Sequence, residues 1–145
     1  MQEILIHKLH DYVSRNNPDV LIILEQEGRV TTYLKEKLSS VDTILNELIS
    51  AGTPPSQIEE LCMDWLTADL RPSRYNYIEE ILATEFPAVH RQLKEAGILT
   101  TEILNMIKAC KEVFEGLRFS ETTVESRLLH YATAGAIYEY LENKK

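Results

Sequence analysis

The chain has 145 residues, of which 44% are hydrophobic and 26% charged. This composition is typical of a globular protein and excludes a disordered chain, so we expect one domain over residues 1–145. The net charge of −8 opposes phosphate backbones and anionic membrane surfaces, which makes nucleic acid an unfavourable partner. The longest apolar run, Val20 to Leu24, is too short to span a membrane, and the N-terminus lacks the apolar core of a secretion signal. We therefore expect a cytoplasmic protein without membrane contact.

Apolar residues recur at three- and four-residue spacing along most of the chain, which predicts amphipathic helices. The first expected helix ends before Asn16-Asn17-Pro18, and Pro18 could begin a short second helix that is interrupted at Gly28. A long third helix is then expected, with apolar residues at spacings of 4, 3, 4 and 3: Leu34, Leu38, Val41, Leu45 and Leu48. Gly52 is expected to end this helix, because glycine readily adopts the left-handed backbone found at helix ends.

The next expected helix begins after Pro54-Pro55 and runs to about Leu70, where Pro72 prevents it from continuing. Its expected inward residues are Ile58, Leu61, Cys62, Trp65 and Leu66. Ser73 is a suitable N-cap for a further helix, which buries the apolar residues Ile78, Ile81, Leu82 and Phe86. Pro72 and Ser73 are therefore expected to mark a break between two helices.

Pro87 is expected to kink or restart the helix that follows Ser73, and the apolar side of this helix continues to Gly97. Further helices are expected from Thr100 or Thr101 to Gly116 and from a start signal at residues 120–125 to the end. The inward residues expected in the last helix are Val124, Leu128, Tyr131, Ala132, Gly135, Tyr138 and Leu141. No alternating strand pattern occurs in the sequence. The prediction is an all-α, single-domain bundle of about six or seven helices.

No arrangement of residues specifies a reaction, a metal or a cofactor. Glu3, His7 and His10 share a helical face, but their spacing lacks the intervening glutamate of a zinc protease, which favours surface histidines without a metal. Cys62 and Cys110 lie among apolar residues and are expected to be reduced core thiols. We therefore expect no catalytic residues, no metal site and no cofactor, and we predict that the protein is not an enzyme.

The loop before residue 74 is the strongest candidate for a binding site. It combines two guanidinium groups with a helix start, whose free N–H groups also favour an anion; its residues are Arg71, Ser73, Arg74, Tyr75 and Tyr77. An acidic peptide, a carboxylate or a phosphate fits this chemistry. In the alternative interpretation, the arginines pair with acidic helices nearby and the tyrosines pack with their hydroxyl groups at the surface.

The same stretch resembles the signature of a small bacterial family of unknown function, whose all-helical members often lie in conjugative-transposon regions. In that family, a Leu, Ser, Lys/Arg, Tyr pattern precedes a helix that ends in Glu-Phe. The matching residues are Leu70, Ser73, Arg74, Tyr75, Glu85 and Phe86. The resemblance implies a helical fold and a bacterial, cytoplasmic context, and it brings no activity with it.

These observations favour a non-catalytic interaction or accessory protein that binds a protein partner or itself. One alternative is a module that binds a small anionic ligand at Arg71 and Arg74, and another, implied by the resemblance alone, is an accessory factor of a mobile genetic element. Arg71, Arg74 and Tyr75 are expected to be at least partly exposed. Trp65 is expected in the core, where its replacement by alanine would cost about 3–5 kcal/mol.

Overall fold

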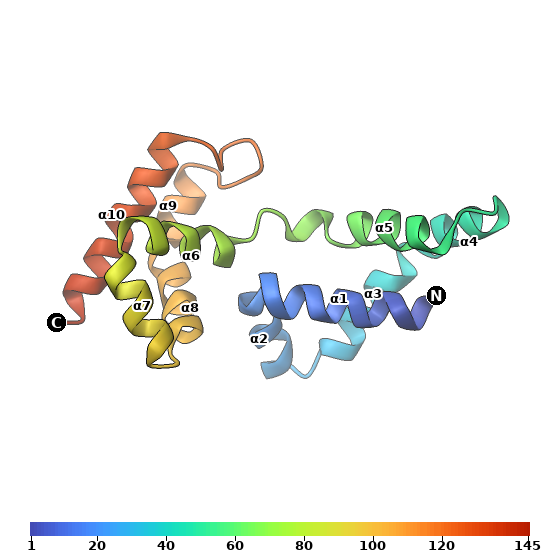
Figure 1. Cartoon of the computed structure of the whole chain (residues 1–145), viewed down its shortest axis with the longest axis horizontal. Helices are drawn as coiled ribbons and strands as arrows, with labels where there is room; N and C mark the ends of the chain where they lie inside the picture. Colours follow the sequence, from blue (N-terminus) through green and yellow to red (C-terminus); the bar gives the residue numbers. More distant parts are fainter. The chain divides into compact units, whose positions relative to one another are not determined.

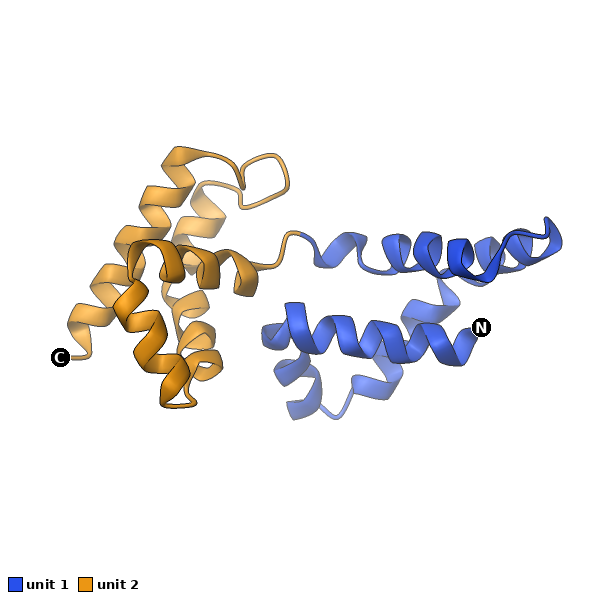
Figure 2. Cartoon of the chain, in the orientation of Figure 1, with its two compact units in different colours: residues 1–71 blue, residues 72–145 orange.

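A computed structural model describes all 145 residues, and its regular elements are ten α-helices and one 3₁₀ helix (Figure 1). No strand is present, so the predicted all-α class is confirmed. The chain divides into two compact units, residues 1–71 and residues 72–145 (Figure 2). The single domain over residues 1–145 stays a prediction. No helix combines the length and the apolar character needed to cross a membrane.

Unit 1 contains α1 (Gln2–Asn16), α2 (Pro18–Gln26), α3 (Val30–Ser39), α4 (Asp42–Ser50), α5 (Pro55–Leu66) and the 3₁₀ helix η1 (Ala68–Leu70). Helix α1 packs against α2, α3 and α5, and α4 packs against α5. The core of unit 1 contains Leu5, Leu9 and Val13 of α1, which are four residues apart and fully buried. These helices therefore bury their apolar stripes against one another inside the unit.

The helix count exceeds the expected six or seven because some of the expected helices are divided. The long helix predicted after Gly28 is two helices, α3 and α4, with a break at Ser40 and Val41. The Ser40 hydroxyl donates to the carbonyl oxygen of Lys37 at 2.5 Å, and this local bond competes with continuation of the helix. The predicted end at Gly52 is confirmed, since α4 ends at Ser50 with Ala51 as its C-cap and Gly52 follows with φ +72°.

The inward face predicted for α5 is partly wrong. Ile58, Cys62 and Leu66 form a buried row with four-residue spacing, whereas Leu61 and Trp65 are exposed, Trp65 to 56%. Successive helical residues are about 100° apart, so the positions directly before this narrow row point away from α1 and α4. The expectation that Trp65 lies in the core is therefore wrong.

Unit 2 contains α6 (Arg74–Glu85), α7 (Pro87–Glu95), α8 (Leu99–Ala109), α9 (Lys111–Gly116) and α10 (Arg127–Asn143). Helix α6 packs against α7, α8 and α10, and α10 also packs against α8 and α9. The break predicted at Pro72 and Ser73 is confirmed. Arg71 is extended, and the Ser73 side chain accepts a hydrogen bond from the Asn76 backbone N–H at 3.0 Å, as an N-cap does.

A buried carboxylate joins α8 to α10 in unit 2. Glu102 accepts hydrogen bonds from the Tyr140 hydroxyl at 2.8 Å and from the Lys144 ammonium at 2.5 Å. The hydrogen bond from Lys144, supported by that from Tyr140, lowers the pKa of Glu102 below its usual value despite burial. This network fixes the C-terminal half of α10 on the rest of the unit.

Candidate functional site

The five residues of the predicted loop site are distributed over both units. Arg71 is the last residue of unit 1, and Ser73, Arg74, Tyr75 and Tyr77 belong to unit 2. The Arg71 guanidinium donates from Nε to the Thr67 carbonyl oxygen at 3.4 Å and from Nη2 to the Asp64 carbonyl oxygen at 3.1 Å. Arg71 therefore binds backbone carbonyl groups at the C-terminal end of α5, where a cation also complements the helix dipole.

Arg74 and Tyr75 contribute mainly to the packing of unit 2. The Arg74 guanidinium carbon lies 5.3 Å from the centre of the Phe114 ring and 5.9 Å from that of Phe119, within cation–π range. Tyr75 is buried, and its hydroxyl lies 3.1 Å from the Thr100 hydroxyl. The expectation that Tyr75 is exposed is therefore wrong, because the first turn of α6 packs against α8. Partner binding by this set of residues stays a prediction.

Tyr77 connects the predicted set to a pocket in unit 2. Its ring is buried against Phe114 and Phe119 in edge-to-face contacts, with ring centres 6.1 Å and 5.2 Å away. Burial raises the pKa of Tyr77, the nearby Thr133 hydroxyl partly offsets this, and the charge of Glu80 raises the pKa further, while the buried Tyr77 hydroxyl has no hydrogen-bond partner. Tyr77 is therefore neutral at physiological pH and lies close to negative charge.

The pocket, of about 410 Å³, lies between α6 and the start of α10. Its lining residues are Tyr77, Glu80, Ile81, Thr84, Glu85, Val124, Glu125, Ser126, Arg127 and His130. Three glutamates outnumber the two basic residues in this lining, so the pocket favours a cationic group. Two of these lining residues pair with each other, since the His130 Nε2 atom lies 3.0 Å from a Glu85 carboxylate oxygen. No group of three or more His, Cys, Asp or Glu side chains is arranged to hold a metal ion.

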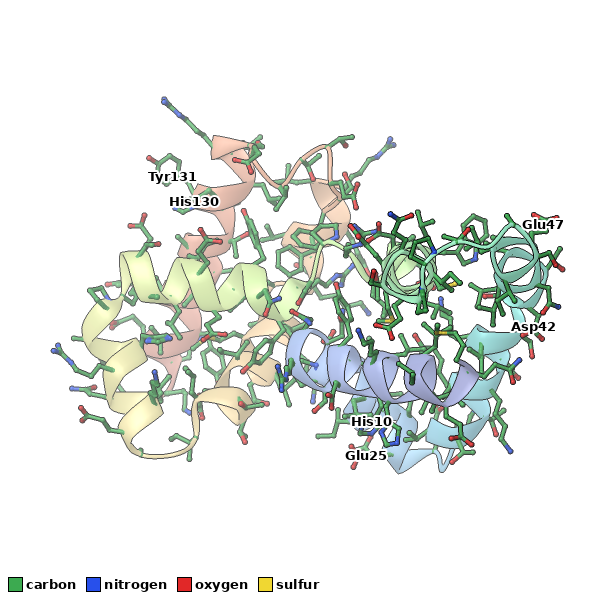
Figure 3. The ribbon with its side chains drawn as sticks, turned by 45° about the vertical axis from the view of Figure 1, so that its right-hand side comes forward. His10, Glu25, Asp42, Glu47, His130 and Tyr131 are labelled. Atoms are coloured by element: carbon green, nitrogen blue, oxygen red, sulfur yellow. The ribbon has the colours of Figure 1, made fainter.

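A second surface feature is the outer side of α10, which we call the α10 face. It consists of Leu128, Tyr131, Gly135 and Tyr138, and its three large side chains are 66%, 65% and 55% exposed. The inward orientation predicted for these residues is wrong, because α10 instead buries the row Leu129, Thr133 and Ile137. Figure 3 shows Tyr131 next to His130 on the ribbon of α10. Apart from its chain neighbours and the backbone of its own helix, no atom lies within 4 Å of where a Cβ atom on Gly135 would be.

The sequence pattern does not distinguish the two sides of α10. Leu128, Tyr131 and Tyr138 lie on one helical row, and Leu129 and Ile137 lie on another, so both rows have the apolar spacing of a buried face. Gly135 is the one local signal for an outer contact surface, since a glycine in the middle of a helix is unfavourable unless close packing requires it.

The fold and these surfaces define a small all-α protein with an exposed aromatic helix face. A family described as a domain of unknown function, DUF1896, matches residues 6–145. The chain therefore belongs to the DUF1896 family, and the match includes most of unit 1 and all of unit 2. No curated protein and no solved structure matches the chain. Membership of a family of unknown function agrees with the resemblance noted in the sequence, while bacterial origin and a conjugative-transposon context stay predictions.

Proposed function

We propose that this protein is a non-catalytic, cytoplasmic interaction protein that binds a protein partner through the α10 face. The exposure of Leu128, Tyr131 and Tyr138 along one side of a single helix is the observation that supports this proposal. Isolated exposed apolar residues are common, but contiguous apolar surface on a folded protein is typical of interaction sites. Tyrosine is also enriched among the residues that contribute most to binding at protein interfaces.

The α10 face is held on a rigid support, which lowers the entropy lost on binding. On its inner side, Leu129 and Ile137 are buried in the core of unit 2. The Tyr131 ring makes an edge-to-face contact with His130, with ring centres 5.3 Å apart, and His130 in turn pairs with Glu85 of α6. Tyr131 therefore contacts a residue that is itself tied to α6.

Two other roles have less support. A module for small anionic ligands would use Arg71 and Arg74, but Arg71 already binds carbonyl groups and Arg74 lies over two aromatic rings. An accessory role for a mobile genetic element is supported by the family resemblance alone. The α10 face is therefore the surface on which we base the proposal.

Site-specific photo-cross-linking in the host cell tests this function. The photoreactive residue benzoylphenylalanine replaces Tyr131 or Tyr138 in the α10 face, and in a control it replaces Ile98, another exposed apolar residue of unit 2. Covalent adducts to a protein are expected at positions 131 and 138 but not at position 98. Absence of adducts at both α10 positions, or equal adducts at all three positions, contradicts the proposal.

A further inference from the structure

We infer that the α10 face binds a second copy of the chain, with the two α10 helices antiparallel and crossing at Gly135. This inference rests on the proposed function and names its partner.

The spacing and shape of the α10 face fit a second helix. Leu128, Tyr131, Gly135 and Tyr138 follow one another at intervals of 3, 4 and 3 residues, the repeat with which two helices pack lengthwise. At about 100° per residue they lie within roughly a quarter of the helix circumference, and so form one narrow stripe. No other part of unit 2 covers this stripe, since all its large side chains are exposed.

Gly135 gives the stripe its self-complementary form. It leaves bare backbone between the rings of Tyr131 and Tyr138, and nothing inside the unit approaches within 4 Å of where its Cβ would lie. Glycine is unfavourable in the middle of a helix, and no packing contact inside the unit requires a glycine at position 135. When two copies cross at this residue, their backbones approach closely, and the rings on either side of one glycine pack beside the other helix.

The charges at the ends of α10 favour the antiparallel direction. Arg127 lies at the N-terminal end of the exposed side, and Glu139 lies toward its C-terminal end, whereas Glu142 at that end is already paired with Lys145 at 2.9 Å. Arg127 and Glu139 are exposed and make no ion pair within the chain. An antiparallel pair brings Arg127 of each copy toward Glu139 of the other and opposes the two helix dipoles, whereas a parallel pair places like charges together.

The contact is expected to be weak. A single pair of helices of this length forms an interface at the small end of the range, below about 1,200 Å² in total, where affinities are typically modest. We therefore expect a dissociation constant on the order of micromolar, with monomer and dimer exchanging as the concentration changes.

Cysteine cross-linking of the purified full chain tests the direction of the pair. The two native cysteines, Cys62 and Cys110, are fully buried, so an introduced surface cysteine reports on its own. Gly135→Cys is expected to form a disulfide-linked dimer under mild oxidation. Leu128→Cys alone is not, because the two copies of residue 128 would lie about 21 Å apart along the helix axis. A mixture of Leu128→Cys and Glu142→Cys is expected to form the mixed dimer. Cross-linking of Leu128→Cys to itself overturns the antiparallel arrangement.

Sedimentation equilibrium across a concentration series tests whether the second copy is the partner at all. Gly135→Gln introduces a good helix former where no atom is nearby, so it should leave the fold intact while weakening association at least tenfold. Ile98→Glu, which changes an exposed apolar residue elsewhere in unit 2, should leave association unchanged. A wild-type chain that stays monomeric up to several hundred micromolar overturns the inference. Photo-adducts to a different protein at position 131 would then still support the proposed function, and their absence would overturn both.

Discussion

Replacing the buried Glu102 with glutamine is expected to lower the free energy of unfolding by about 1–3 kcal/mol. The carboxylate side chain is only 9% exposed and accepts two hydrogen bonds, from Tyr140 and Lys144. Glutamine keeps the shape but removes the charge, and its amide N–H₂ faces one of the two donors. The Lys144 side chain is about half exposed, so solvent screens its charge, and the loss is expected to combine a reduced contribution from Lys144 with that of the bond from Tyr140.

The pH dependence of this loss follows from the direction of the pKa shift. The hydrogen bonds from Lys144 and Tyr140 hold the pKa of Glu102 below its usual value in the folded chain. The folded state therefore binds this proton less readily than the unfolded state does, so the stabilisation is complete above the ordinary glutamate pKa and is lost as the pH falls through the lowered one. The difference in unfolding free energy between wild type and Glu102→Gln should be constant near pH 7 and shrink below about pH 4.

Urea unfolding followed by circular dichroism measures the effect at several pH values. Glu142→Gln is the matched control, because Glu142 is an exposed carboxylate of α10 that pairs with Lys145 at 2.9 Å. We expect this control to change the unfolding free energy by less than about 0.5 kcal/mol. Equal losses in both variants, or a loss in Glu102→Gln that does not change with pH, would refute the role given to the buried network.

Three further outcomes are expected. Trp65→Ala should cost less than about 1 kcal/mol in urea unfolding, because the side chain is mostly exposed; a loss of 3 kcal/mol or more would restore the core placement predicted from the sequence. Arg74→Ala should destabilise the chain by about 1 kcal/mol through loss of its contacts with two rings, and intact stability with weakened partner capture would instead favour the loop as a binding site. Cys62 and Cys110 should resist a thiol reagent at pH 8 until the chain is unfolded, since both are buried and burial raises the pKa of Cys110 to about 12; rapid labelling of the folded chain would contradict this.

The features of the fold that depend on local chemistry were predictable from the sequence. Pro72 and Ser73 end one helical segment and begin the next, and Gly52 follows the end of α4 in a left-handed conformation. Each of these signals acts through the backbone of a few neighbouring residues, so tertiary contacts do not change it. The all-α class follows from the same kind of signal repeated along the chain.

Which side of a helix is buried was not predictable in the same way. In α5 and α10, two neighbouring rows both have apolar spacing, and contacts with distant helices select the row that contains Cys62 or Thr133. The pocket was not predictable for the same reason, because it depends on contacts between residues far apart in the chain. Two of its lining residues, His130 and Glu85, are 45 positions apart. Of the predicted site residues, only Tyr77 lines it.

Side-chain oxidation by hydroxyl radicals, measured at two protein concentrations, tests the role of the α10 face most directly. Tyr131, Tyr138 and Trp65 are each more than half exposed in one copy, so all three should react readily in dilute solution, at about 0.05 micromolar, well below the expected dissociation constant. At several hundred micromolar, we expect Tyr131 and Tyr138 to become protected while Trp65 reacts as before. Unchanged reactivity of both tyrosines across this range would contradict the account, because it would leave the α10 face uncovered at concentrations where a second copy should bind.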